Sequence, residues 1–343
     1  MKENQFNPNS LGIPNGNYFA LPYTPEEADI VLLSVPWDVT TSYRSGTHKG
    51  PKAIIDASTQ IDLFDPLVPN AWEIRIGTLP PLKGIDKENK TIRKAAERVI
   101  AALEKEWEPD TRTLSLVNNA CETLNQTVYQ TARTQLEQGK LVGIVGGEHS
   151  VPLGLIQALT DHYPSFGILH IDAHADLRNA YEGFSYSHAS IMYNAIQLSG
   201  VQLTQVGIRD YCQEEADLIA SLEQIKCFTD EALRRRLFEG AHWHALCNQI
   251  VDTLPNNVYI SFDIDGLTPD CCPHTGTPVP GGLSFREADY LLHTLAISQK
   301  HIIGFDLCEV APAKEEEWDA NVGARILYKL CCYTHLNQNK KFR

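Results

Sequence analysis

Two short segments of the sequence concentrate side chains that can bind metal ions. The segment DAHAD, residues 172–176, carries two aspartates and a histidine, and DID, residues 263–265, carries two more aspartates. Alternation along an extended chain would point Asp172, His174 and Asp176 to the same side. Four carboxylates gathered without cations would repel one another and raise one another's pKa. We therefore expect the four aspartates to share bound cations.

A histidine in a third segment extends this donor set. His149 lies in GGEHS, residues 146–150, and brings the candidates to four aspartates and two histidines without a thiolate. Such a set suits a harder divalent ion such as Mn²⁺ better than a structural Zn²⁺. Six ligands are too many for one tetrahedral ion, so we predict two divalent ions, which would also activate a water molecule as a nucleophile. The predicted metal ligands are His149, Asp172, His174, Asp176, Asp263 and Asp265.

The candidate residues follow short apolar runs that are predicted as β-strands. The expected strands span residues 30–35, 141–145, 166–171, 202–208, 257–262 and 301–307. Amphipathic segments predict helices over residues 89–107, 121–138, 152–162, 188–198, 286–296 and 322–333. This alternation is typical of a parallel sheet buried between helices. Because the carboxyl ends of parallel strands share one edge, His149, both acidic segments and Glu309 should converge there.

No repeat or linker divides the chain, so we expect one catalytic domain over residues 29–335. Residues 1–28 are rich in Asn, Pro and Gly and are predicted to form an extended arm that wraps the body or reaches a neighbouring subunit. Residues 336–343 are expected to form a polar tail. The dipeptides Thr24-Pro25 and Gly50-Pro51 place proline where a helix could begin.

Composition narrows the class of protein and of partner. The formal net charge of −14 over 343 residues argues against a nucleic-acid or anionic-membrane partner and suits a small cationic substrate. The nine cysteines include no CxxC spacing, which favours a reducing compartment. No stretch resembles a signal peptide or reaches the length of a membrane span. We expect a soluble, cytoplasmic protein.

Each motif taken alone also has a simpler explanation. A single DxHxD or DxD is often a turn or surface feature, and a lone Glu after a strand usually has no chemical role. Their joint occurrence at strand ends favours one shared site. His242 and His244 in AHWHAL could form a second metal site, although a helical or surface role is favoured. Ordinary roles are expected for His48, His162, His293 and His301.

The combined motifs identify a resemblance to a known superfamily. Five segments carry it: GGEHS (146–150), HIDAHADLR (170–178), SFDIDGLTPD (261–270), TGTPVPGGLS (275–284) and GFDLCEVAP (304–312). They resemble the ureohydrolases, which include arginases, agmatinases and formimidoylglutamases. Their order and spacing agree over nearly the whole chain, from about residue 31 to residue 333.

The resemblance implies a three-layer α/β/α domain with a mainly parallel sheet of about eight strands and a binuclear centre loaded with Mn²⁺, or with Ni²⁺ as an alternative. One ion would be bound by His149, Asp172, Asp176 and Asp263, and the other by Asp172, His174, Asp263 and Asp265. Glu309 would orient the guanidinium group of the substrate, and His188 or Asp176 would relay a proton to the leaving amine. The resemblance also implies a homo-oligomer, either a trimer or a hexamer.

The segment DAHADLRNAYEGFSYSHAS is most similar to the agmatinase-like branch, so agmatine is the expected substrate and urea an expected product. Guanidine, guanidino acids, arginine and formiminoglutamate are alternatives. Tyr181, Arg178 and Asp210 lie where contacts with the far end of the substrate could arise.

Three residues depart from the family pattern. Glu148 stands where Asp is usual, Thr268 replaces the Asp of an Asp-Pro pair, and His274 replaces a Gly. The first two should alter hydrogen bonds around the ligands. We expect the bulkier His274 to narrow the pocket, and the extra segment at residues 104–117 could do the same. Cys271-Cys272 lies near the expected mouth of the site and is interpreted as an inert pair rather than an oxidisable one.

Two other classes of protein remain as alternatives. A deacetylase of related fold would lack the second Asp of DAHAD and the DID segment. A catalytically silent, metal-binding regulator with the same fold would usually have lost a ligand, whereas all six candidates, Glu309 and His188 are present.

Overall fold

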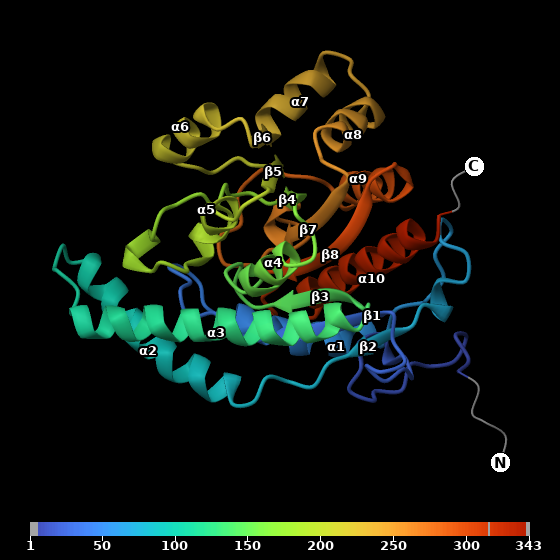
Figure 1. The fold of residues 1–343 in the computed structure, drawn as a ribbon, viewed down its shortest axis with the longest axis horizontal. Helices are drawn as coiled ribbons and strands as arrows, with labels where there is room; N and C mark the ends of the chain where they lie inside the picture. Colours follow the sequence, from blue (N-terminus) through green and yellow to red (C-terminus); the bar gives the residue numbers. More distant parts are fainter. Residues whose placement is uncertain (1–5, 315, 341–343) are drawn as a thin grey trace.

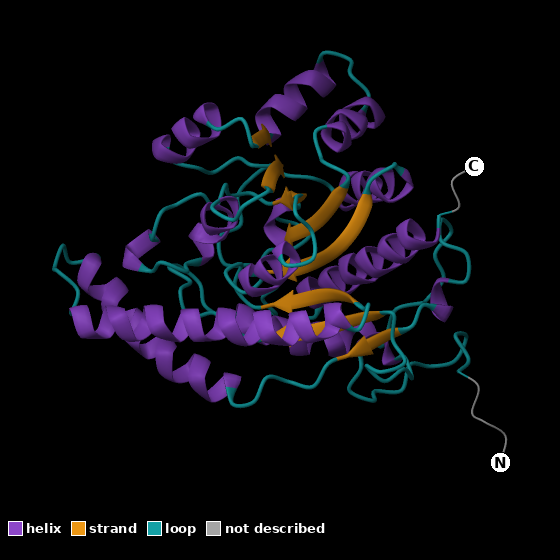
Figure 2. Ribbon diagram, in the orientation of Figure 1, coloured by secondary structure: helices purple, strands orange, loops and turns teal. Residues whose placement is uncertain are grey.

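Eight parallel β-strands form the centre of the molecule. The computed structural model describes residues 6–314 and 316–340. The strands lie in the order β2-β1-β3-β8-β7-β4-β5-β6 and are flanked by helices on both faces (Figures 1 and 2). Their bounds are β1 Ile30–Val35, β2 Ile76–Thr78, β3 Leu141–Gly146, β4 Phe166–Ile171, β5 Val201–Val206, β6 Ile225–Phe228, β7 Asn257–Asp263 and β8 His301–Cys308.

Two apolar clusters, one on each face of the sheet, join it to the helices. The helices are α1 Gly50–Ser58, α2 Ile85–Leu103, α3 Thr111–Glu137, α4 Leu153–Thr160, α5 Ile191–Ile196, α6 Gln213–Ser221, α7 Asp230–Phe238, α8 Trp243–Asp252, α9 Phe285–Ile297 and α10 Trp318–Asn339. One cluster includes buried residues of α1 and α8 to α10, and the other includes buried residues of α2 to α5. The expected three-layer fold with about eight parallel strands is therefore confirmed.

The six strands predicted from apolar runs are present, with ends that differ by at most two residues. Two strands were missed, β2 and β6, which occupy the two edges of the sheet. They span only three and four residues, so no alternating pattern could distinguish them from loops. The central strands are nearly continuous runs of buried residues, because helices cover them on both sides.

Several helix predictions need correction. Helix α3 begins at Thr111 rather than at residue 121, and Asp110 caps it by accepting a hydrogen bond from the backbone N–H of Thr113. Helices α6, α7 and α8 were missed. The Gly50-Pro51 pair does begin α1. Thr24-Pro25 instead forms a turn, in which the carbonyl of Thr24 accepts from the N–H groups of Glu27 and Ala28.

The two ends of the described chain pack closely on the body. Tyr18 and Phe19 are buried, the Tyr18 hydroxyl lies 2.7 Å from the Ser34 hydroxyl, and the Phe19 ring packs edge-on against Tyr328 at 5.1 Å between centroids. At the other end, α10 continues to Asn339, so residues 336–339, which we expected in a polar tail, are helical. Among the described residues, no helix combines the length and hydropathy needed to cross a bilayer.

Because the N-terminal segment is buried against the body, we expect its apolar side chains to contribute to the free energy of unfolding. Phe19→Ala should lower the free energy of unfolding by about 3–5 kcal/mol, because it leaves a cavity against α10. Leu11→Ala, at a side chain that is 79% exposed, should change it by less than about 0.5 kcal/mol. Chemical denaturation followed by circular dichroism measures both values. Equal effects of the two substitutions would contradict the packing described for Phe19.

Candidate metal centre and active-site pocket

Four neighbouring strands bring the predicted ligands together. β3, β8, β7 and β4 are adjacent in the sheet, and the candidate residues lie at or just beyond their carboxyl ends. His149 follows β3, the 172–176 segment follows β4, Asp263 is the last residue of β7, and Glu309 follows β8. The convergence expected from the sequence is therefore present in the structure.

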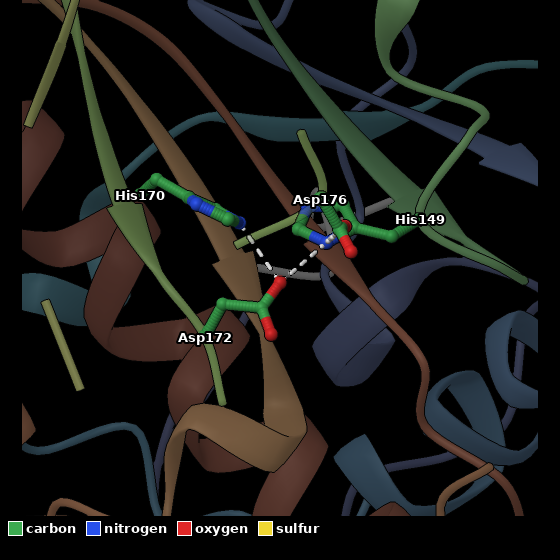
Figure 3. A group of neighbouring side chains, drawn as sticks. All are labelled: His149, His170, Asp172 and Asp176. Atoms are coloured by element: carbon green, nitrogen blue, oxygen red, sulfur yellow. Dashed lines mark hydrogen bonds and ion pairs between the residues drawn. The ribbon is translucent and has the colours of Figure 1, made fainter. Parts of the chain in front are cut away.

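His149 is the centre of the first group of metal-binding atoms. Its Nδ1 atom lies 3.1 Å from Asp172 Oδ2, 3.4 Å from Asp176 Oδ2 and 3.3 Å from Asp263 Oδ2. All four side chains are buried. Figure 3 shows His149 and Asp176 facing Asp172 across a small space. One imidazole nitrogen and three carboxylates thus point at the same volume.

The second group shares Asp172 with the first. His174 Nδ1 lies 3.2 Å from Asp265 Oδ2 and 3.5 Å from Asp172 Oδ1. Asp172 therefore presents Oδ2 to the first group and Oδ1 to the second. A carboxylate that uses its two oxygens in this way is suited to bridge two ions, as the sequence resemblance implied.

The charges in this cluster require compensation. Burial, together with the negative charge of Asp172, raises the pKa of Asp176 to about 6. Burial and the neighbouring Asp265 raise the pKa of Asp263 well above its usual range. Carboxylates that resist ionisation for these reasons become fully ionised when cations bind between them. The donor set of oxygen and imidazole nitrogen fits two divalent ions.

A further histidine supports the ligands. His170, in β4, is buried and its Nε2 atom lies 2.8 Å from Asp172 Oδ2 (Figure 3). On the other side of the ring, Gln205 Nε2 lies 3.0 Å from His170 Nδ1. The hydroxyl of Ser261 lies 2.9 Å from Nε2 of His149. Sequence analysis missed His170 as a site residue. Its signal was the same alternation that selected Asp172, because His170 precedes Asp172 by two residues.

Glu309 lies beside the metal-binding atoms. Its Oε1 atom accepts a hydrogen bond of 2.8 Å from the backbone N–H of His149. Burial and the nearby Glu148 raise the pKa of the Glu309 carboxyl well above its usual range. Glu309 has φ 63° and Asp176 has φ 53°, both in the left-handed region that costs a non-glycine residue energy. Two of the predicted site residues are thus held in strained backbone conformations.

His188 begins a short 3-10 helix, His188–Ser190, at the wall of the pocket. Burial and the positive charge of His174 lower the pKa of His188 to about 4, so its imidazole is neutral near pH 7. Tyr181 stands nearly perpendicular to it, with 6.2 Å between ring centroids.

These residues line a cavity of about 200 Å³. Glu309, His188 and all of the predicted metal ligands except Asp172 lie with Arg178, Tyr181 and Asp210 around the same space. Arg178 is paired with Glu215, with 3.1 Å between Nε and Oε2. The Asp210 side chain is 68% exposed and approaches His174 Nε2 at 4.0 Å. The structure therefore brings the predicted substrate contacts into one pocket.

The departures from the family pattern have different outcomes. Our expectation for His274 was wrong: its Nδ1 atom lies 2.8 Å from Asp319 Oδ2, and its side chain does not line the cavity. Nor does any residue of the 104–117 segment line it. Thr268 donates its N–H to the carbonyl of Leu283. Cys271 and its neighbour Cys272 are buried, which agrees with their interpretation as an inert pair.

Glu148 is the most consequential departure. It is fully buried, and burial raises its pKa to about 7. Its carboxylate accepts hydrogen bonds from the N–H and hydroxyl of Thr40 and from the hydroxyl of Ser150.

The two histidines of the AHWHAL segment lie away from this site. His244 Nδ1 lies 2.9 Å from the hydroxyl of Tyr290 on the surface, and neither His242 nor His244 joins a metal-binding group among the described residues.

Residues 28–332 match the arginase family. An N(1)-aminopropylagmatine ureohydrolase of Thermus thermophilus is 34% identical over 287 residues, which cover 84% of each chain. An agmatinase of Bacillus subtilis is 29% identical over 311 residues, covering 89% of this chain and 91% of that protein. The agmatine ureohydrolase of Thermoplasma volcanium has a similar fold, with a TM-score of 0.73, 23% identity and 95% of each chain covered.

The family match covers most of the chain, including every candidate ligand. Together with the similarity to ureohydrolases, it shows a hydrolase of amidino C–N bonds. The chain therefore belongs to the arginase family.

Proposed function

We propose that this enzyme hydrolyses the guanidino group of agmatine, or of an agmatine extended at its amine end, and releases urea. The observation that carries the proposal is the buried Glu309 carboxylate beside the metal-binding atoms, at a cavity with an acidic side chain, Asp210, at its exposed rim. A guanidinium group is planar and permanently charged, and a buried carboxylate is its natural partner.

The six predicted ligands are proposed to hold two Mn²⁺ ions, with Ni²⁺ as the alternative. Asp172 and Asp263 would contribute to both ions. His149 and Asp176 complete one set, and His174 and Asp265 complete the other. Bound divalent ions supply a nucleophile by acidifying water near neutral pH.

The remaining steps are carried by residues of the pocket. Glu309 holds the guanidinium carbon in place, because its ionised form is restored by a cation that enters the buried site. The departing amine needs a proton, which His188 or Asp176 delivers. Asp210 and Tyr181 contact the far end of the substrate: the carboxylate attracts its ammonium group and the ring packs against its alkyl chain. The relatives named for agmatine and for N(1)-aminopropylagmatine support a substrate with such an amine end.

We also propose that the protein is a cytoplasmic homo-oligomer, either a trimer or a hexamer. Its nine cysteines are free, as expected in a reducing compartment. Leu11, Ile13 and Phe64 leave large apolar side chains exposed and could be covered between subunits.

Loss of a shared ligand should remove both metal and activity. Asp172→Asn and Asp263→Asn should each reduce bound Mn²⁺, measured by mass spectrometry of the metal, and bring urea release from agmatine to background. Asp252→Asn, an exposed aspartate at the end of α8, is the matched control and should retain both. Full activity of either ligand variant would contradict the proposed metal centre.

Glu309 should matter for substrates that carry a guanidinium group. Glu309→Gln should lower kcat/KM for agmatine by about 30-fold or more, because removing one partner of a buried charge pair costs about 2–5 kcal/mol. The content of bound metal should stay unchanged. Steady-state urea release with metal analysis tests this, and unchanged kcat/KM would show that the guanidinium binds elsewhere.

The exposed Asp210 should strengthen the binding of substrates that carry an ammonium group at the end opposite the guanidinium. Asp210→Asn should raise KM for agmatine by about twofold to fivefold, because exposed ion pairs contribute only about 0.2–1 kcal/mol. It should leave guanidine, which has no amine end, unaffected. Urea release from agmatine, arginine, guanidine, guanidinobutyrate and formiminoglutamate, with Mn²⁺ and Ni²⁺, ranks the substrates. No release from any of them would favour a silent metal-binding regulator.

A further inference from the structure

A buried glutamate outside the proposed ligand set contacts the segment that carries Asp176. Glu215 lies in the first turn of α6 and is 4% exposed. Its Oε1 atom accepts a hydrogen bond of 3.0 Å from the backbone N–H of Leu177. Its Oε2 atom accepts hydrogen bonds from Nε of Arg178 at 3.1 Å and from the backbone N–H of Cys212 at 2.8 Å. Both carboxylate oxygens are therefore bonded to N–H donors.

The bond to Leu177 holds one end of the peptide group that joins Asp176 to Leu177. At the other end of this peptide, the carbonyl of Asp176 accepts the backbone N–H groups of Met192 and Tyr193, each at 3.1 Å. The N–H and the C=O of the peptide are thus both held. Asp176 has φ 53°, a left-handed conformation that persists only where the surrounding contacts impose it. Glu215 supplies one of these contacts.

We infer that Glu215 is a positioning residue for the metal ligand Asp176. The inference rests on the proposed function, in which Asp176 binds one of two Mn²⁺ ions. The Oδ2 atom of Asp176 lies 3.4 Å from Nδ1 of His149, within the first group of metal-binding atoms. If the peptide after Asp176 turned, this residue could leave its left-handed conformation, and its carboxylate would move relative to His149. Side chains that orient a metal ligand in this way commonly change metal affinity by about 10-fold to 100-fold.

Glu215 also has two simpler explanations. It could serve only as a cap of α6, because a glutamate at the third position of a helix accepts the N–H that precedes the first turn. This role does not account for the bond to Leu177, which lies 38 positions away in the chain. Glu215 could instead bind substrate, because it lies in the wall of the cavity. Its burial and the N–H donors on both oxygens oppose that role.

The test is a titration of the full, metal-free chain with Mn²⁺, in which electron paramagnetic resonance detects the ion that stays free in solution. The unaltered protein should bind two ions. In Glu215→Gln, the single oxygen can keep the two donors from Arg178 and Cys212 only by placing the amide NH₂ against the N–H of Leu177. The binding of one ion should therefore weaken by about 10-fold to 100-fold. Glu215→Ala, which removes both oxygens, should weaken it at least as much.

Glu287→Gln is the matched control. Glu287 occupies the same third position in α9, where it accepts the backbone N–H of Ser284 at 2.8 Å and pairs with Arg234, with 2.6 Å between Nη1 and Oε1. Its side chain does not line the cavity. The control should lower the midpoint of thermal unfolding, as Glu215→Gln does, and leave Mn²⁺ binding unchanged.

Two double-mutant cycles identify the ion that is weakened. Asp176→Asn alone should weaken the binding of one ion, and adding Glu215→Gln should have little further effect, because both changes act through the same ligand. Asp265→Asn removes a ligand from the other set. In that background, the loss caused by Glu215→Gln should persist in full.

Unchanged Mn²⁺ binding in both Glu215 variants would overturn the inference, and so would a Glu215→Gln loss that persists in full with Asp176→Asn. A raised KM for agmatine with unchanged Mn²⁺ binding would make Glu215 a substrate contact and would also overturn it. These results would leave the proposed metal centre intact. An unaltered chain that bound no Mn²⁺ would refute both, whereas the expected cycles in a chain that releases no urea would support the inference and refute the proposed reaction alone.

Discussion

Mutual repulsion among buried carboxylates is the constraint on which the rest of this structure depends. Asp172, Asp176, Asp263 and Asp265 all lie within the interior at one edge of the sheet. Burial and like charge raise the pKa of Asp176 and Asp263, whereas the neighbouring His170 and His149 hold the pKa of the buried Asp172 well below its usual range. Such an arrangement is costly unless cations enter it. A site of this kind is built for metal binding rather than for the stability of the fold.

The sheet explains how so unfavourable a cluster is held in place. Its four central strands, β3, β8, β7 and β4, end side by side beneath helices that cover both faces. Rigid strands deliver the ligands, while loops adjust their orientation. Asp176 and Glu309 adopt strained left-handed conformations in the segments that follow β4 and β8. The strain persists because backbone hydrogen bonds, such as that from the Glu309 N–H to the carbonyl of Gly147, hold the chain in this geometry.

The central strands and their ligands could be predicted from the sequence because both depend on local patterns. Apolar runs such as β4 marked the strands, and alternation beyond them marked Asp172 and His174. Contacts between distant segments could not be predicted in this way. His274 turns toward Asp319 on α10, and Thr40 meets Glu148 across 108 positions of the chain. The edge strands β2 and β6 were too short to carry a period. Such features depend on tertiary packing, which a single sequence does not display.

The central claim is that this edge of the sheet holds two divalent cations that share Asp172. Crystals of the protein grown with Mn²⁺ and measured at a wavelength where manganese scatters anomalously test it most directly. The account predicts two anomalous peaks, one among His149, Asp172, Asp176 and Asp263 and one beside His174 and Asp265. No peak in this cluster, or a single ion bound by other residues, would contradict it.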